Sequence, residues 1–503
     1  MKRQLTHENT LKVKPLGIDT YREHIIFMRS DCNICLSEGF AALTRLVVRY
    51  GSKSIVATLN VVHSDLLQEH EAGLSDMALS RLEVTAGDFI SVSHLKQIES
   101  LSDVRSKMYH HKISEEAYRR IVDDITKGLY SDIEIAAFIA GCAGDNLDDE
   151  EITWLTSAMV NSGATLSWKT QMVFDKHCIG GLPGNRTTPI VVAIVAAAGL
   201  TIPKTSSRAI TSPAGTADTM ETITNVNLEL EKLKEVVSLE GGCLAWGGSV
   251  NLSPADDILI AVEKALDVDS AGQMIASVLS KKVAAGSTHV VIEIPYGESA
   301  KVRSREQAMK LERCFKAVGE AMHLNIKVLI TDGSQPVGRG IGPALEAMDV
   351  LSVLENRKDA PTDLKEKSIM IAAAVLELSG TFEQGKGSKF ARRILEGGKA
   401  YKKFKAICMA QGRFEVPAFA RYNTDIKSEV GGRVTSIDNR KLARVAKLAG
   451  APHDHSAGIY FNAPIGTKVK PGQVLYTIYA EAKGELQYTL DYVKSAGPII
   501  KIT

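Results

Sequence analysis

The sequence predicts an α/β protein with a helical lobe, a large mixed α/β lobe, a small β-rich N-terminal domain and a β-rich C-terminal subdomain. Short apolar–polar alternation in the first 92 residues, as in HIIFMR and KSIVATLNVV, is typical of strands. The period becomes helical from residue 94, and later strands such as HVVIEIP and IKVLITDG alternate with helices. That alternation indicates a mostly parallel sheet with helices on both faces. Period-two alternation around Gly-Pro turns returns after residue 425.

The predicted domain boundaries follow these changes in period. The N-terminal domain covers residues 1–92, the helical lobe 93–168 and 254–286, the α/β lobe 169–253 and 287–425, and the C-terminal subdomain 426–503. Helix starts are predicted at Ser114, at Ser131 with Glu134 as a capping box, and at Ser270 as an N-cap. Further helices are predicted within 148–163, 230–240, 256–265 and 440–448.

Composition excludes several classes of protein. The net charge is +1 and 24% of residues are charged, so no basic face for nucleic acid is expected. Seven scattered cysteines indicate reduced thiols in a cytoplasmic protein, and the Cys32–Cys35 CxxC has no partner at zinc spacing. The first residues lack the apolar segment of a signal peptide, and the apolar run 190–200 is too short to span a membrane. We therefore expect no metal, no membrane contact and no nucleic-acid partner.

A glycine-rich stretch, VFDKHCIGGLPGNRTTP, is the strongest candidate for a binding loop. A short apolar strand end leads into a loop with Gly180, Gly181 and Gly184, and a helix follows with Thr188 as its predicted N-cap and Pro189 at its first position. Such a loop leaves backbone N–H groups at a positive helix end, where anions bind. Lys176 and Arg186 add positive charge.

A second donor-rich loop follows closely. It comprises Ser206, Ser207, Arg208, Ala209, Ile210, Thr211 and Ser212, and it leads to Gly215 and Thr216. Gly, Ser and Thr are also common in ordinary turns, so one such loop is weak evidence. The spacing matches neither GxxxxGK[ST] nor GxGxxG. Two adjacent loops, each with a cation and hydroxyls, therefore favour a site for inorganic phosphate.

Four ordered motifs resemble those of the thymidine and pyrimidine nucleoside phosphorylase family. They are DKHCIGGLPGN, SSRAITSPAGTAD, IASVLSKK and TDGSQPVGRGIG, and the resemblance extends from about residue 94 to the end of the chain. The N-terminal domain and the forms KHxIGGxPGNxTT and SSRAITS are similar to a subgroup that includes the archaeal AMP phosphorylases. The resemblance implies a helical lobe and an α/β lobe that close over a cleft, in a homodimer or a higher homo-oligomer.

The resemblance also implies roles for individual residues. Lys176, Cys178, Thr188, Ser206 and Thr216 match phosphate binders, together with Gly180 and Gly181 of the loop. Ser277 and Lys281, four residues apart on one predicted helix face, match a pair that holds the nucleobase, and His177 matches a histidine beside it. Ser207, Arg208, Ala209, Ile210, Thr211, Ser212 and Lys301 are the other candidate substrate binders. Asp269, Lys281 and His177 are the candidate catalytic residues.

The chain departs from the family pattern in ways that leave the substrate open. Cys178 replaces a serine, and a thiol is the weaker hydrogen-bond donor. The family arginine that binds the pyrimidine falls near Val262 and Glu263, where this chain has no arginine. Lys301 and Asp269 instead resemble residues of AMP phosphorylases. Lys281 and Lys301 are also compatible with solvated lysines, and Asp269 with a carboxylate at a helix start.

Three functions are consistent with these patterns. The leading hypothesis is phosphorolysis of thymidine to thymine and 2-deoxyribose 1-phosphate, with phosphate as co-substrate and no cofactor. Positioned donors around phosphate, and a group that stabilises the departing base, are what this reaction requires. The second hypothesis is phosphorolysis of AMP to adenine and ribose 1,5-bisphosphate. The third is a phosphate- or nucleotide-binding protein without turnover.

Overall fold

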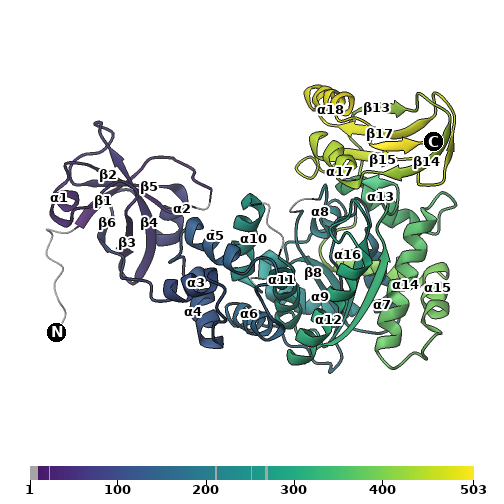
Figure 1. Ribbon diagram of the computed structural model, residues 1–503, viewed down its shortest axis with the longest axis horizontal. Coiled ribbons are helices and arrows are strands. Elements are labelled where there is room, and N and C mark those ends of the chain that lie inside the picture. The colour runs from purple at the N-terminus through teal and green to yellow at the C-terminus, as the bar shows by residue number, and fades with distance from the viewer. Residues whose placement is uncertain (1–9, 22, 210–211, 251, 267–269) are drawn as a thin grey trace. The chain divides into compact units, whose positions relative to one another are not determined.

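The structure is a computed structural model that describes residues 10–21, 23–209, 212–250, 252–266 and 270–503 (Figure 1). The chain divides into two compact units. The first contains the described residues up to Arg105 and Asp123–Ile135, and the second contains Ser106–Val122 and Ala136–Thr503. The predicted α/β fold class is confirmed, whereas the four domain ranges given above stay predictions.

The first unit is built on a closed six-stranded barrel with the strand order β1-β5-β2-β4-β3-β6. The barrel strands are β1 (Thr10–Pro15), β2 (Ile25–Arg29), β3 (Arg45–Tyr50), β4 (Lys53–Val62), β5 (Glu71–Leu74) and β6 (Phe89–His94), and two short helices, α1 (Asn33–Glu38) and α2 (Asp76–Leu82), accompany them. Alternate residues point inward, so that Leu46 and Val48 of β3 are fully buried. The segments HIIFMR and KSIVATLNVV form β2 and β4, as predicted.

A run of helices follows the barrel. These are α3 (Leu101–Met108), α4 (Glu115–Thr126), α5 (Asp132–Gly141) and α6 (Asp149–Asn161), with α10 (Pro254–Leu266) and α11 (Ala271–Ala284) added later in the chain. The hydroxyl of Ser270 accepts a hydrogen bond from the backbone N–H of Gln273 and caps α11, as predicted. Glu134 accepts from the Ser131 backbone N–H at 2.7 Å, as a capping box requires. Helix α6 packs against α11 in the second unit.

Five parallel strands form the centre of the α/β region. Strands β7 (Phe174–Cys178), β10 (His289–Tyr296) and β11 (Asn325–Asp332) make one sheet in the order β11-β10-β7, and β8 (Ile202–Ser206) pairs with β9 (Gly242–Trp246). A single parallel bridge, Val173 to Thr201, connects the two sets. The predicted single sheet is thus present as two short parallel sheets, because β7 and β8 pair at only that bridge among the described residues.

Helices surround these strands and supply the main apolar core. They are α7 (Thr187–Ala197), α8 (Thr216–Glu221), α9 (Leu230–Glu240), α12 (Arg305–Ala321), α13 (Pro343–Leu354), α14 (Thr362–Leu378), α15 (Gly387–Glu396) and α16 (Lys399–Ala410), with the short 3-10 helix η2 (Gly247–Val250). Helix α7 is buried on all sides, because α13, α14, α15 and α16 pack around it. Its residues from Ile190 to Val195 are fully buried.

The C-terminal region consists of two antiparallel sheets with two helices. One sheet has the order β12-β15-β17-β13 and the other β16-β14-β18. The strands are β12 (Gly340–Ile341), β13 (Tyr422–Lys427), β14 (Gly432–Ile437), β15 (Gly458–Phe461), β16 (Lys468–Val469), β17 (Val474–Ala480) and β18 (Ile500–Ile502). Helix α17 (Asn439–Leu448) was predicted, whereas α18 (Lys483–Ser495) was not. Within the described residues, no helix is long and apolar enough to cross a bilayer.

Candidate active site

The carboxyl ends of the three strands β7, β10 and β11 lie at one edge of their sheet, and the loops that follow them meet there. Gly184 forms a parallel bridge with Val337, which belongs to the loop after β11. A Cβ atom at Gly181, whose φ is +87°, would overlap with the backbone nitrogen of Lys301 in the loop after β10. Ligands of parallel sheets bind at this edge. The glycine-rich loop and Lys301 are therefore neighbours at the expected place.

Strand β7 presents the first candidate phosphate ligand. Lys176 is almost fully buried, and its Nζ donates to Oγ1 of Thr187 at 2.7 Å and to Oγ1 of Thr188 at 3.3 Å. Its ammonium group thus lies at the N-terminal end of α7, next to the backbone N–H groups of the first turn. Charge and N–H donors in one place are the features that bind an oxyanion.

The predicted start of α7 is wrong by two residues. The N-cap is Arg186 instead of Thr188, and Pro189 is the third helical residue instead of the first. Thr188 cannot act as the cap, because its residue lies inside the helix and its hydroxyl accepts from Lys176. No side chain among the described residues caps the first turn. Within that turn the Thr187 N–H donates to the Asn185 carbonyl at 2.8 Å and Pro189 has no N–H, so the Thr188 N–H is the donor left for a ligand in the described first turn.

A buried carboxylate supports Lys176 from β10. Glu293 lies 3.7 Å from Lys176 and 2.6 Å from Lys367 of α14, and Thr331 of β11 donates to it at 3.1 Å. Burial alone would raise the pKa of Glu293, but the charges of Lys176 and Lys367 outweigh it and lower that pKa. We call Glu293, Lys176 and Lys367 the Glu293 cluster.

A second buried carboxylate lies one residue earlier on β7. Asp175 lies 3.1 Å from Lys204 of β8 and 2.6 Å from Lys282 of α11. Burial tends to raise the pKa of Asp175, yet the two ammonium groups hold it below its ordinary value. Burial and the charge of Lys204 lower the pKa of Lys282 to about 7. We call Asp175, Lys204 and Lys282 the Asp175 cluster.

Burial, together with neighbouring charges, keeps His177 neutral and Cys178 a thiol. Burial, then the charges of Lys282, Lys204 and other lysines, lower the pKa of His177 well below its ordinary value, so its imidazole is neutral. Burial and the carboxylate of Glu293 raise the pKa of Cys178 to about 11. The side-chain amide of Asn185 donates to the Cys178 sulfur at 3.3 Å.

The second donor-rich loop is organised by Asp218 of α8. Its Oδ2 accepts from the backbone N–H groups of Ala209 at 2.7 Å and Gly215 at 2.8 Å. Arg186 connects this loop with the first one, because it donates to Oγ1 of Thr216 at 2.8 Å and to the Ala214 carbonyl at 2.9 Å. The buried carboxylate of Glu346 of α13 holds Arg186 at 2.6 Å. The two predicted phosphate loops are thus joined by one guanidinium group.

Several candidate residues of the second loop make contacts within the protein. Ser206 donates to the Ala245 carbonyl at 3.3 Å, and Ser212 to the Ala214 carbonyl at 2.9 Å. The backbone carbonyl of Ser207 accepts from Ala217 at 3.4 Å. The predicted binders Ile210 and Thr211 lie outside the described residues.

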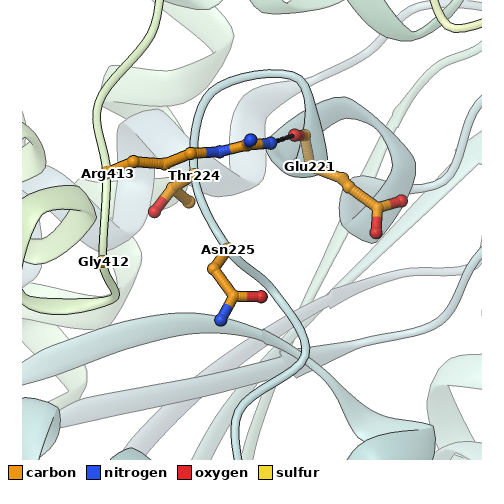
Figure 2. Close-up of a pocket in the computed structure, with 5 residues that line it drawn as sticks. All are labelled: Glu221, Thr224, Asn225, Gly412 and Arg413. Carbon is orange, nitrogen blue, oxygen red and sulfur yellow. Dashed lines mark hydrogen bonds between the residues drawn. The ribbon is translucent and has the colours of Figure 1, made fainter.

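Arg208, the cation of this loop, is engaged on two sides. Its guanidinium group pairs with Asp218 and Glu221 and lies 5.0 Å from the ring centre of Trp246. Glu221 also lines a cavity of about 290 Å³ with Thr224, Asn225, Gly412 and Arg413. In Figure 2 the Arg413 side chain reaches the backbone carbonyl of Glu221, at 2.7 Å, while the Glu221 carboxylate points to the other side. None of the predicted site residues lines this cavity.

The predicted base-binding pair lies on α11. Ser277 and Lys281 are half-buried and one turn apart, and Lys281 lies 2.5 Å from the buried carboxylate of Asp256 on α10. Lys281 is therefore a paired residue rather than a solvated lysine. Asp269, the candidate proton donor, lies outside the described residues. No group of three or more His, Cys, Asp or Glu residues that could hold a metal ion occurs in the described part of the chain.

The sequence motifs do not single out the residues that position these groups. They are Asp175, Lys204, Asp256, Lys282, Glu293, Glu346 and Lys367. One signal was present: a charged Glu293 in the middle of the apolar strand HVVIEIP is expected only where it has a partner. The partners themselves are distant in sequence and follow from the fold.

Comparison with known proteins agrees with this architecture. Three family models match the chain: "Glycosyl transferase family, helical bundle domain" at residues 104–163, "Glycosyl transferase family, a/b domain" at 170–401, and "Pyrimidine nucleoside phosphorylase C-terminal domain" at 433–499. Two solved anthranilate phosphoribosyltransferases share the fold. The Thermus thermophilus enzyme has a TM-score of 0.51 and 18% identity over 61% of this chain and 98% of its own. The Saccharomyces cerevisiae enzyme, solved with PRPP and Mg, has a TM-score of 0.51 and 12% identity over 63% and 99%.

Relatives of much higher identity extend over nearly the whole chain. A protein of Legionella pneumophila (strain Corby) named "Putative thymidine phosphorylase" is 54% identical over 490 residues, 97% of this chain and 95% of its own. A protein of the same name from Hahella chejuensis is 52% identical over 494 residues, 98% of each chain. The fold and these matches define a glycosyltransferase of the pentosyltransferase type. The chain belongs to the thymidine and pyrimidine nucleoside phosphorylase family.

Proposed function

We propose that this protein is a phosphorylase that cleaves thymidine with inorganic phosphate to thymine and 2-deoxyribose 1-phosphate. The observation that supports this most is the charge beneath the glycine loop. The Asp175 and Glu293 clusters contain four lysines and two carboxylates, which leaves two positive charges in excess when all six groups are ionised. Because the pKa of Lys282 is about 7, the excess near neutral pH lies between one and two positive charges, and such a buried excess next to the start of α7 favours an anion as ligand.

The proposed reaction is a displacement at C1′ of the sugar. A phosphate oxygen held by Lys176, Thr188 and the glycine loop forms the new C1′–O bond while the C1′–N bond breaks. The electron pair of that bond moves into the base, where a hydrogen-bond donor or a cation stabilises it. Lys281 and Ser277 of α11 and the neutral imidazole of His177 are the candidates for this role. Because no covalent intermediate on the protein is needed, the arrangement of these donors determines the rate.

A second candidate substrate is AMP, which would yield adenine and ribose 1,5-bisphosphate. Two observations favour it: the backbone of Lys301 lies against Gly181, and Val262 and Glu263 of α10 occupy the region where the pyrimidine-binding arginine is expected. A lysine whose backbone adjoins the glycine loop suits a substrate with a second phosphate, if its ammonium group turns toward the site. A homodimer and a cytoplasmic location remain proposals.

The decisive experiment is release of free base from a panel of substrates, with and without phosphate. Thymidine, uridine, cytidine and AMP are incubated with the purified full chain, and both the base and the sugar phosphate are quantified by chromatography. We expect thymine and 2-deoxyribose 1-phosphate in equal amounts, and only when phosphate is present. Release of adenine alone would select AMP. Binding of phosphate without release from any substrate would leave a binding protein as the function.

A further inference from the structure

The Asp175 cluster joins the two halves of the candidate site through one ion pair. Asp175 directly precedes Lys176, the candidate phosphate ligand on β7, and Lys282 directly follows Lys281, the candidate base ligand on α11. Nζ of Lys282 lies 2.6 Å from Oδ2 of Asp175. This contact therefore sets the distance between the strand that would hold phosphate and the helix that would hold the base.

The third member of the cluster connects the second donor-rich loop. Nζ of Lys204 lies 3.1 Å from Oδ1 of Asp175 and donates to the Thr205 carbonyl at 2.8 Å. Lys204 belongs to β8, which ends at Ser206, the first residue of that loop. One carboxylate thus contacts a lysine on each side, from β8 and from α11. The loop, the helix and β7 cannot shift independently without separating buried charges, which is strongly unfavourable in a protein interior.

We propose that Asp175, Lys204 and Lys282 are positioning residues for phosphorolysis, which hold the phosphate-binding strand and the base-binding helix in the reactive arrangement without contacting either substrate. The proposal rests on the proposed function and extends it to residues that the family motifs did not single out. The side chains of Lys204 and Lys282 are 5% and 4% exposed, and that of Asp175 is not exposed. Both lysines direct their ammonium groups at Asp175, whereas Lys176 directs its own at the hydroxyls that begin α7, so an effect of Lys204 or Lys282 on catalysis would act through the positions of the elements that they join.

Titration of Lys282 would make the arrangement of the site, and with it the activity, depend on pH. Asp175 faces Lys282 from β7 and Lys204 faces it from β8, while the further charged or titratable groups around the cluster include Lys176, His177, Lys281 and Cys243 of β9. Burial lowers the pKa of Lys282 to about 7. Above that pH the amine loses its charge, and its attraction to Asp175 weakens. The arrangement of α11 against β7 should therefore loosen as the pH rises.

A matched control exists elsewhere in the same unit. Lys107 pairs with Glu151 of α6 at 2.7 Å, and the two side chains are 2% and 3% exposed. This pair resembles Lys282 and Asp175 in distance and burial, but it connects helices that contain none of the candidate site residues. Breaking it should destabilise the protein to a similar degree without disturbing the site.

The test compares the variants Lys282→Met, Asp175→Asn and Lys107→Met with the wild-type full chain. Steady-state rates are measured with phosphate and with the substrate that the wild type cleaves, per folded molecule as judged by near-UV circular dichroism. Lys282→Met and Asp175→Asn should each lose about 100-fold in kcat while KM for either substrate changes by less than about threefold. Lys107→Met should keep the wild-type kcat.

A pH profile supplies the second readout. Lys282→Arg keeps a positive charge at all pH values tested, so its activity relative to wild type should rise above pH 7. Titration of phosphate itself cancels in this ratio. If Lys282→Met does not fold, Asp175→Asn and the arginine variant provide the test.

Two outcomes overturn the proposal. Losses in Lys282→Met and Asp175→Asn no larger than in Lys107→Met, or a flat arginine-to-wild-type ratio, would show that the cluster only stabilises the fold. Wild-type protein that releases no base from any substrate would overturn the proposed function first, and the positioning role with it. Activity of the wild type therefore distinguishes the two failures.

Discussion

At the scale of single residues, the candidate site contains four buried lysines and two buried carboxylates. Lys176 shares Glu293 with Lys367, and the closer partner of Glu293 is Lys367 at 2.6 Å rather than Lys176 at 3.7 Å. The Lys176 ammonium therefore has no short ion pair to Glu293, and it donates instead to the hydroxyls at the start of α7. This leaves much of its charge available to phosphate.

The first prediction concerns Lys176. Lys176→Ala should lower kcat/KM for phosphate about 10- to 150-fold, because a hydrogen bond to a charged partner is worth roughly 1.5–3 kcal/mol. Phosphate saturation kinetics at fixed nucleoside measure this effect. The control is Lys327→Ala, which removes a lysine paired with Glu377 on another part of the α/β region. Equal kinetics in the Lys176 and Lys327 variants would contradict the assignment of Lys176.

A second prediction follows from Glu346, the carboxylate that holds Arg186. Burial raises its pKa to about 7 in spite of the nearby guanidinium group. The folded protein therefore binds this proton more tightly than the unfolded chain does, and the stabilisation is complete below the ordinary pKa of 4.5 and is lost as the pH rises to about 7. The loss amounts to about 3 kcal/mol at most.

Glu346→Gln should remove this dependence. The free energy of unfolding of wild type minus that of Glu346→Gln should fall as the pH is raised between about 4.5 and 7. Urea denaturation at several pH values measures it. Asp349, whose pKa burial raises to about 6, is present in both proteins and its own contribution largely cancels. A difference that stays constant across this range would show that Glu346 is ionised throughout.

At the scale of elements, the loops after β7 and β10 touch at a point where only glycine fits. Gly180 and Gly181 have nearly equal φ angles of +89° and +87°, so alanine is strained at both. Only at Gly181 would the added Cβ overlap with the Lys301 backbone, since a Cβ at Gly180 meets nothing within 4 Å. Alanine at position 180 therefore tests backbone strain alone, whereas alanine at position 181 tests strain together with the contact between the loops.

The third prediction uses this pair. Gly180→Ala should reduce activity modestly, because the strain of a left-handed residue costs roughly 1–2 kcal/mol. Gly181→Ala should reduce kcat/KM for both phosphate and nucleoside at least about tenfold further, since the loops must move apart. Parallel kinetics of the two variants provide the measurement. Similar activities in both would mean that the contact with the Lys301 loop is not needed for catalysis.

At the same scale, helix ends were predicted correctly where residues close in sequence determine them. Neighbouring residues predict the helix starts at Ser114, Ser131 and Ser270 and the bounds of α9, and the structure confirms them. The start of α7 was wrong because Thr188 is engaged by Lys176, a contact between two elements. The Asp175 and Glu293 clusters were missed for the same reason: their members lie up to 191 residues apart and meet only after the strands pair. The pattern of neighbouring residues therefore identified the two donor-rich loops, but not the Asp175 and Glu293 clusters.

At the scale of the whole molecule, the matched family models leave out the N-terminal barrel, whereas the full-length relatives include most of that region. The three family models begin at residue 104, after the barrel. Relatives named "Putative thymidine phosphorylase" nevertheless align over 97% of this chain, so they share most of that N-terminal region as well. The matches to the anthranilate phosphoribosyltransferases, by contrast, cover 61% and 63% of this chain. We propose that residues at the site select the substrate, and Lys301, which resembles a lysine of AMP phosphorylases, is one candidate.

The last prediction tests Lys301 as the residue that selects the substrate. Its backbone lies against Gly181, and its exposed side chain follows β10 at the sheet edge where ligands bind. An ammonium group there would attract a phosphorylated substrate, whereas an apolar side chain would favour a neutral nucleoside. Lys301→Phe should therefore raise the ratio of kcat/KM for thymidine over AMP, by about tenfold or more for the loss of one charged contact. Lys301→Arg, which keeps the charge, is the control and should retain the wild-type ranking of thymidine, uridine, cytidine and AMP under saturating phosphate. Identical rankings in the wild type and Lys301→Phe would exclude Lys301 from substrate selection, and a wild type that cleaves AMP but not thymidine would replace the leading substrate with the second.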